Sequence, residues 1–326
     1  MKFLQISFKY RNSDAITFPA NPANTFRGAL GFQLLRIACV QRKTSNQGCR
    51  NCDLFSRCAY AKCYETSSHH IRGSSSEGSE DMPHLMVIDS GFPGLQTLAP
   101  GNEFCFRVIL FGHGIETVPY IIVAARNAGL MGLTRQRVPC ELISVVEDGS
   151  QAKIWSEEND HLQIPEATQL KVAEPDLSQV ATSRINLKFI TPVAFKDKRT
   201  GHPTLEPDFA RIVGSLMRRY SSFEASEGND LNWNYARIAE LARKVRLTSI
   251  NAAPVYWERF SSRQNQRIPI SGIIGQATYE GPVRPFFDLL QAGQIIRCGR
   301  STTFGQGRIC FEETEVGKTD TFLFAS

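Results

Sequence analysis

The chain has 326 residues and a mass of 36.4 kDa, which is enough for about two domains of ordinary size. Hydrophobic residues make up 42% and charged residues 21%, as in ordinary globular proteins, so the composition excludes the disordered and fibrous classes. No apolar run reaches the ~18 residues that a membrane span needs, and Met1–Tyr10 alternates like a strand where a signal peptide would be continuously apolar. We therefore expect a cytoplasmic protein with no membrane partner.

The formal charge of +5 is unevenly distributed along the chain. Residues 181–310 hold 19 Lys and Arg against 10 Asp and Glu, a net of +9, which leaves −4 for the rest. A basic half joined to a slightly acidic half indicates either a polyanion-binding surface or a solvated basic face. The nine cysteines form an odd number, which argues against a disulfide framework in a chain without a secretory signal.

The first half predicts a strand, a helix, strands, a helix and a strand. Phe3–Tyr10 is the first strand, and Thr25 is the expected N-cap of the first helix. The elements that follow are a cysteine-rich stretch at Cys39–Cys63, strands at Met86–Ile88 and Phe104–Leu110, a helix at Thr117–Ala128 stopped by Gly129, and a strand at Val138–Val146. This order is typical of the ferredoxin-like fold, in which two helices cover one face of an antiparallel sheet.

The second half repeats the scheme. Ile185–Phe195 alternates apolar with basic and polar residues, which predicts a strand with one basic face. Further elements are expected as helices at Asp208–Tyr220 and Asn232–Val245, strands at Val255–Phe260 and Ile268–Tyr279, a short helix at Arg284–Leu290 and a strand at Arg308–Glu312. The predicted fold class is therefore α+β, with two tandem ferredoxin-like (RRM-like) domains at residues 1–165 and 180–326. A cysteine-rich insertion at residues 39–66 belongs to the first.

A glycine-rich segment, residues 298–308, lies between the short helix and the last strand. Glycines permit positive φ and close backbone approach, and Arg300 and Arg308 supply charge for phosphates. The segment lacks the Gly-Lys-Ser/Thr of a Walker loop, and it leads into a strand where a dinucleotide fingerprint would open a helix. It is either a phosphate-binding loop or a glycine-bulged hairpin turn.

Gly299–Gly307 resembles the C-terminal glycine-rich loop of the RAMP superfamily of CRISPR-associated RNA-binding proteins. The segments that resemble one branch of it, the Cas6 endoribonucleases that process pre-crRNA, are Phe26–Gly31, Cys58–Tyr60, Thr191–Pro192, Pro207–Phe209 with Arg218–Arg219, Trp257–Gln264 and Ser271–Gly275. They occur in order over almost the whole chain. The resemblance implies two tandem RAMP domains, the second of which carries the glycine-rich loop.

Five of the nine cysteines are clustered, as Cys39 followed by Cys49-x2-Cys52-x5-Cys58-x4-Cys63. Three or four thiolates on a loop can close a tetrahedral zinc site, and an iron–sulfur cluster is the alternative. Zinc is favoured because the spacing follows no familiar ferredoxin run. For the fourth ligand, spacing alone favours Cys63, whereas the resemblance implies Cys39 with Cys49, Cys52 and Cys58. We expect a structural zinc ion that holds a polar loop.

The resemblance also implies a ribonuclease without a catalytic metal, in which the ribose 2′-hydroxyl attacks the adjacent phosphate. Such a reaction needs a general base, a general acid and a cation near the phosphate. Histidine titrates close to neutral pH, and in the family it commonly comes from the first domain near the first helix. His69 and His70 are therefore the first catalytic candidates and His113 is the second. The alternatives are a solvated loop for the pair and a turn residue for His113.

RNA contacts are expected mainly in the basic second half. The candidates are Lys196, Arg199, Arg259, Arg263, Arg267, Gly299, Arg300, Gly305, Gly307 and Arg308. Since each phosphate contact releases counterions, binding through these groups should weaken as salt is added.

The leading hypothesis is an endoribonuclease that binds CRISPR repeat RNA and cuts pre-crRNA into mature guide RNA. One alternative keeps the fold without the chemistry, as a non-catalytic RAMP subunit of an effector complex with other Cas proteins. The other alternative is an iron–sulfur redox protein.

Overall fold

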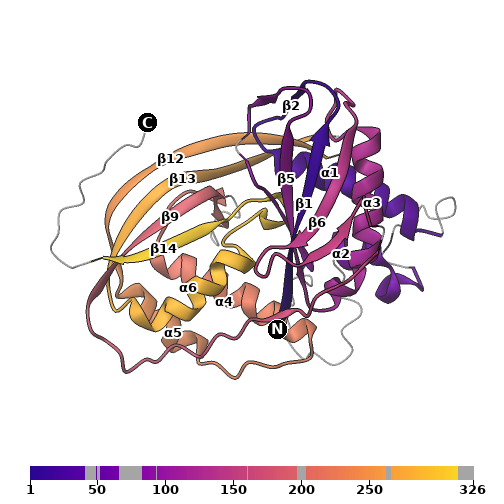
Figure 1. The fold of residues 1–326 in the computed structure, drawn as a ribbon. Coiled ribbons are helices and arrows are strands. Elements are labelled where there is room, and N and C mark those ends of the chain that lie inside the picture. The colour runs from indigo at the N-terminus through magenta and orange to yellow at the C-terminus, as the bar shows by residue number, and fades with distance from the viewer. Residues whose placement is uncertain are drawn as a thin grey trace.

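The computed structural model describes residues 1–40, 49, 52–65, 83–92, 94–159, 161–196, 203–261 and 266–314. Each half of the chain builds a large antiparallel sheet with helices packed against it, and the two halves lie side by side (Figure 1). Within the described ranges, none of the helices combines the length and the apolar character needed to cross a bilayer.

The sheet of the first half has the strand order β3-β5-β1-β6-β7, with β8 paired to the start of β1. Its strands are β1 (Lys2–Asn12), β3 (Met86–Ser90), β5 (Glu103–Phe111), β6 (Cys140–Glu147), β7 (Lys153–Ser156) and β8 (Thr168–Gln169). Helices α1 (Pro22–Ala38) and α3 (Val118–Met131) pack against each other and cover one face. The short helix α2 (Ala59–Tyr64) packs against α1, and β2 (Ile16–Thr17) pairs with β4 (Thr97–Leu98).

The sheet of the second half has the order β12-β13-β9-β14. Its strands are β9 (Ser183–Val193), β12 (Arg246–Ser261), β13 (Gln266–Gly281) and β14 (Ile309–Thr314). Its helices are α4 (Phe209–Ser226), α5 (Tyr235–Arg243) and α6 (Phe287–Ile296), and β10 (Phe195–Lys196) pairs with β11 (Pro203–Thr204). The β12–β13 hairpin is long and reaches across to the first half (Figure 1).

The two halves share one topology. Four strands of each unit can be compared in chain order: β1, β3, β5 and β6 in the first half, and β9, β12, β13 and β14 in the second. In both sheets the second of these strands lies at one edge, and the third, the first and the fourth follow in that order. The orders are β3-β5-β1-β6 and β12-β13-β9-β14. This arrangement, with a helix after the first strand and another after the third, is the ferredoxin-like fold and confirms the predicted fold class.

The alternation of β1 and β5 explains how the halves are joined. Ile6 and Phe8 point to the face that α1 and α3 cover and are fully buried there. On the other face of the same sheet, Ile109 and Phe111 belong to the core of the second half, where the ring of Phe111 lies 4.4 Å from that of Phe223. The part of the first sheet around Ile109 and Phe111 is therefore buried on both faces, and the two halves share apolar packing.

Two predicted helix boundaries were wrong. Helix α1 begins before Thr25, because Asn21 is its N-cap and accepts a hydrogen bond from the N–H of Asn24 at 3.1 Å. Pro22 follows at the first helical position, where its missing N–H costs nothing. Gly129 does not end α3, which runs on to Met131. A Cβ on Gly129 would lie 2.2 Å from the carbonyl oxygen of Cys140, so this glycine allows α3 to approach β6.

The strand predicted at Val255–Phe260 is only the last part of β12, which begins at Arg246 and is 16 residues long. Pro254 lies in its interior, opposite Ile273. Because β12 is the edge strand of its sheet, a residue without an N–H is tolerated there.

Candidate nucleic-acid interface

The glycine-rich loop, residues 298–308, connects α6 to β14 and touches the first half. Gly305 and Gly307 have φ of +81° and +82°, which favours glycine. A Cβ on Gly307 would lie 2.1 Å from the carbonyl oxygen of Cys298, and one on Gly305 would lie 2.5 Å from the Cβ of Ala23 in α1. These glycines thus let the loop fold back on itself and lie against α1.

The loop uses its glycine amides internally. The N–H groups of Gly299, Gly305 and Gly307 donate to Ser215 Oγ at 2.9 Å, to the Thr302 carbonyl at 3.2 Å and to the Pro192 carbonyl at 3.0 Å. A backbone phosphate cradle would need these donors to point at the ligand. The loop therefore has side chains, rather than its glycine amides, to offer to a nucleic acid.

Two sequence motifs that lie far apart form one unit around this loop. Arg308 donates its N–H to Thr191 Oγ1 at 2.9 Å, and the amide of Gly307 bonds to Pro192. The Thr191–Pro192 pair thus fixes the point at which the loop enters β14.

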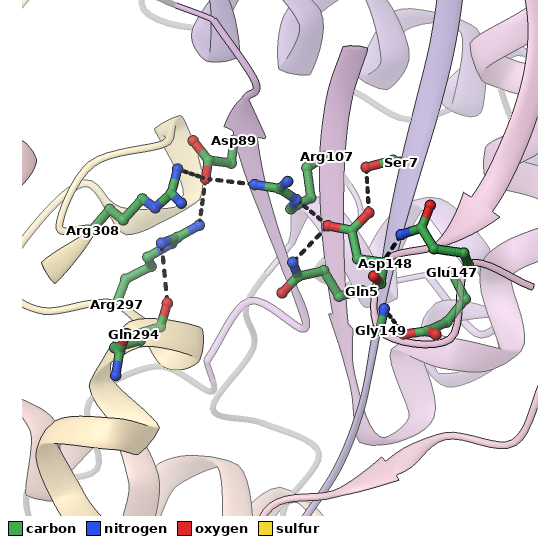
Figure 2. Close-up of polar contacts among 11 residues, drawn as sticks. Gln5, Ser7, Asp89, Arg107, Glu147, Asp148, Gly149, Gln294, Arg297 and Arg308 are labelled. Carbon is green, nitrogen blue, oxygen red and sulfur yellow. Dashed lines mark hydrogen bonds and ion pairs between the residues drawn. The ribbon is translucent and has the colours of Figure 1, made fainter. Parts of the chain in front are cut away.

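A buried carboxylate of the first half binds both ends of the loop (Figure 2). Asp89 Oδ2, in β3, lies 2.8 Å from Arg297 Nη2 and 3.2 Å from Arg308 Nη1. The side chains of Asp89 and Arg297 are only 2% and 3% exposed, whereas Arg308 is 36% exposed. Burial lowers the pKa of Arg297, and the charge of Asp89 acts in the opposite direction. Asp89 therefore fixes the loop by its two flanking arginines.

The network continues across the first sheet (Figure 2). Arg107 of β5 lies 3.7 Å from Asp89 and also forms an ion pair with Asp148, in the turn after β6. Asp148 accepts a further hydrogen bond from Gln5 Nε2 at 2.7 Å and one from the hydroxyl of Ser7. Positive and negative side chains therefore alternate from the glycine-rich loop to the β6–β7 turn, in the order Arg297, Asp89, Arg107 and Asp148.

A second contact between the halves consists of arginines and aromatic rings. We name Arg27, Tyr64, Arg259 and Phe304 the arginine–aromatic cluster. The guanidinium carbon of Arg27 lies 4.5 Å from the ring centroid of Tyr64 and 4.6 Å from that of Phe304. That of Arg259, in β12, lies 4.2 Å from the same Phe304 ring. The cluster thus joins α1, α2, the loop and the β12–β13 hairpin.

The other predicted RNA-binding cations are placed differently. Arg300 is exposed on the loop, and Arg267 is exposed in β13 with Glu258 at 3.2 Å. Lys196 is the last residue of β10, and its backbone pairs with Pro203. Arg199 and Arg263 lie outside the described residues.

Of the three predicted catalytic histidines, His113 is the one that lies within the described residues. His69 and His70 lie outside the described residues. His113 is exposed, with Nδ1 3.2 Å from Glu116 Oε1, and Glu116 also pairs with Lys62 of α2 at 2.6 Å. Lys62 and Tyr64 are two positions apart on α2 and so face nearly opposite directions. The contacts of His113, to Glu116 and through it to Lys62, thus include no member of the arginine–aromatic cluster in the described part of the chain.

The four cysteines proposed as metal ligands line one pocket. Cys39, Cys49, Cys52 and Cys58 surround a cavity of about 140 Å³, which is otherwise largely apolar. Cys63 is buried elsewhere, with Sγ 3.4 Å from Thr117 Oγ1, and burial raises its pKa to about 11. A donor set of four thiols suits zinc. As placed among the described residues, however, no three metal-ligating side chains are close enough together to hold an ion.

The chain thus consists of two tandem ferredoxin-like domains with an arginine-flanked glycine-rich loop held between them. A family model described as an N-terminal domain (AF_1859_N) matches residues 1–167, and the model of CRISPR-associated endoribonuclease Cas6 matches residues 187–309. The second half of the chain therefore carries a domain of the CRISPR-associated Cas6 family.

Individual proteins are similar to this chain in sequence or in fold. An uncharacterized protein of Archaeoglobus fulgidus is 24% identical over 293 residues, which cover 87% of this chain and 89% of the relative. Thermus thermophilus Cas6 matches in structure with a TM-score of 0.53 and 14% identity over 95% of this chain and 98% of its own. The Cas6-containing chain of a partial Cas6-RT-Cas1–Cas2 complex matches with a TM-score of 0.58 and 12% identity, over 99% of this chain and 48% of that chain. At these identities the structural matches show the shared fold.

Proposed function

We propose that the protein is an endoribonuclease that binds CRISPR repeat RNA and cleaves pre-crRNA into guide RNA. The observation that carries the proposal is that the loop inside the region matched by the Cas6 model is fixed between the two halves by Asp89. Similar folds in a Cas6 product complex and a Cas6 substrate mimic complex support RNA as the partner. We further propose a cytoplasmic location, and other Cas proteins are additional candidate partners.

The proposed reaction is transesterification without a catalytic metal. The ribose 2′-oxygen attacks the adjacent phosphorus while a general base takes its proton. The bond from phosphorus to the 5′-oxygen breaks, and a general acid protonates that oxygen. The products are a 2′,3′-cyclic phosphate and a 5′-hydroxyl, so no water or oxidant is consumed. Arginines near the phosphate would stabilise the added negative charge of the transition state.

A cleavage assay with the repeat RNA of the organism's own CRISPR array tests the proposal. We expect cutting in the presence of EDTA, a cyclic phosphate on the upstream product, and no cutting when the nucleotide at the cleavage site is 2′-deoxy. Cutting that stops with EDTA although the melting temperature is unchanged, or a deoxy substrate that is cut, would contradict the mechanism. Binding without cutting would favour the non-catalytic RAMP subunit.

The histidine candidates need separate tests. We expect His69→Ala with His70→Ala to reduce single-turnover cleavage by at least about 100-fold while RNA binding is kept. Unchanged cleavage would eliminate the pair, and His113→Ala would then be the next variant. His161→Ala is a matched control, since His161 is exposed and lies in the connection between β7 and β8.

We also propose that Cys39, Cys49, Cys52 and Cys58 hold a structural zinc ion. All four residues line the same pocket, which supports this proposal. Elemental analysis of purified protein should give one zinc per chain, and Cys58→Ser should lose the zinc and lower the melting temperature. Cys310→Ser is the control, because Cys310 lies in β14, far along the chain from the pocket. Iron with visible charge-transfer absorbance would instead support the iron–sulfur alternative.

A further inference from the structure

The arginine–aromatic cluster lies where four segments from both halves of the chain meet. Arg27 is in the second turn of α1, and the hydroxyl of Tyr64 donates to the Arg27 carbonyl at 2.8 Å. Phe304 is held by its own carbonyl, which accepts a hydrogen bond from Asn21 Nδ2 at 3.1 Å. Arg259 comes from β12, close to the end of the long hairpin. The two guanidinium groups are therefore held against one ring from different halves.

The charges of these arginines are not neutralised within the described residues. Neither Arg27 nor Arg259 forms an ion pair there, and Arg27 Nε is buried without a hydrogen-bond partner. The charge of Glu65 raises the pKa of Arg27, but this is the smallest of the effects on that pKa. No ion pair joins the two residues in the described part of the chain. Arg308, in contrast, is paired with Asp89. The cluster thus contains positive charge that its described surroundings leave unbalanced.

The two arginines also oppose each other. Burial is the main cause that lowers the pKa of Arg259, and the charge of Arg27 lowers it further. Burial likewise lowers the pKa of Arg27. Cation–π contacts attract each guanidinium to the ring but do not cancel its charge. An anion placed near both would remove the repulsion and supply the missing acceptor for Arg27.

The chemistry of the cluster favours an RNA phosphate over other anions. A guanidinium forms a planar fork that matches two phosphate oxygens, and it stacks on aromatic rings and bases. Arg259, Phe304 and Tyr64 are half-buried, so parts of them face solvent. The exposed Arg300 lies on the same loop as Phe304, where it can meet the next stretch of backbone. Charge and stacking surfaces together are typical of single-stranded nucleic-acid sites.

We propose that Arg27 and Arg259 jointly bind one backbone phosphate of the RNA, with the ring of Phe304 as their common support. The inference rests on the proposed function and extends it to Arg27, a residue of the first half that was not among the sequence candidates. RNA would then contact both halves at one point. Binding should stabilise the junction, because the phosphate replaces the repulsion between two cations.

Binding measured as a function of salt tests the proposal. The probe is the repeat RNA with a 2′-deoxy nucleotide at the mapped cleavage site. We expect Arg27→Gln and Arg259→Gln each to weaken binding at least about tenfold. The double variant Arg27→Gln/Arg259→Gln should also reduce the slope of log K against log salt by about 0.7–0.9, the loss of the one phosphate contact that the two residues share. Arg27→Lys should keep the slope, because it keeps the charge, while it weakens binding through loss of the fork.

Arg246→Gln is the matched control, since Arg246 is exposed at the start of β12, the strand that also carries Arg259, and is not among the RNA-binding candidates. The double variant Arg27→Gln/Arg259→Gln should lose less affinity than the two single losses combined, because the residues share one phosphate. A purely structural role predicts lower melting temperatures with unchanged salt slopes, and this result would overturn the inference. Wild-type protein that binds the unmodified repeat but does not cut it would contradict the proposed function. The salt slopes of the variants would then still test the inference on their own. Wild-type protein that does not bind the repeat would overturn both.

Discussion

The carboxylate of Asp89 and the guanidinium of Arg297 lie 2.8 Å apart, come from opposite halves of the chain, and are almost completely excluded from solvent. Each partner alone would be a buried charge, which is costly. Their pairing therefore ties the formation of the glycine-rich loop to the docking of the two halves.

We expect Asp89→Asn to destabilise the protein by about 3 kcal/mol, because it leaves Arg297 buried without a counter-charge. The free energy of unfolding in urea measures this. Glu258→Gln is the control, since its pair with Arg267 is exposed and should contribute less than about 1 kcal/mol. Equal effects of the two variants would show that the Asp89 pair contributes no more than a surface ion pair.

Arg300 and Arg308 should separate RNA contact from loop stability. Arg300 is exposed, whereas Arg308 pairs with Asp89 at 3.2 Å. We expect Arg300→Ala to leave the melting temperature unchanged and to lower RNA affinity. Arg308→Ala should lower both, but it should destabilise less than Asp89→Asn because Arg297 still pairs with the carboxylate. Thermal unfolding together with RNA binding checks this order, and a large loss of stability in Arg300→Ala would contradict it.

Gly307 should tolerate substitution far less than Gly228, although both have φ near +81°. A Cβ on Gly228 meets nothing within 4 Å, so Gly228→Ala should cost only the backbone strain, about 1 kcal/mol. Gly307→Ala carries the same strain and also forces Cys298 to move. Urea denaturation of the two variants measures the difference, which is the contribution of close packing in the loop. Similar losses would mean that the loop can shift at little cost.

The buried thiol of Cys63 should make the protein sensitive to alkaline pH. Burial raises its pKa from 9.0 to about 11. In the unfolded chain the thiol loses its proton first, so rising pH favours unfolding, and the stability present below pH 9 is lost as pH approaches 11. We expect wild-type protein to lose about 3 kcal/mol more than Cys63→Ser over this range. Parallel stability profiles of the two proteins, measured with reductant present, would contradict this expectation.

The order of strands and helices could be predicted from the sequence because it depends on local periodicity. Apolar residues at every second position predict the strand β5, and apolar residues spaced three or four positions apart predict the helix α4. The fold class then follows from the order of elements. The start of β12 was missed because an edge strand that is largely exposed has no apolar alternation to reveal it.

The contacts at the junction could not be predicted in the same way, because their partners are distant. Asp89 and Arg297 are separated by 208 residues, and no sequence motif around either residue indicates that the other is its partner. One signal was present. Asp89 is the only charged residue in the otherwise buried segment Met86–Asp89, and a charge in such a strand needs a partner. For Arg27, the Phe26–Gly31 motif marked the segment but not the side chain's role.

The apolar packing shared by the two halves has a consequence for how the chain could be divided. Ile109 and Phe111 of the first sheet are buried in the core of the second half. A cut in the connection between β8 and β9 would leave each fragment with an uncovered hydrophobic face. Such fragments should therefore be poorly stable apart and should reassociate into a working whole, as in fragment complementation.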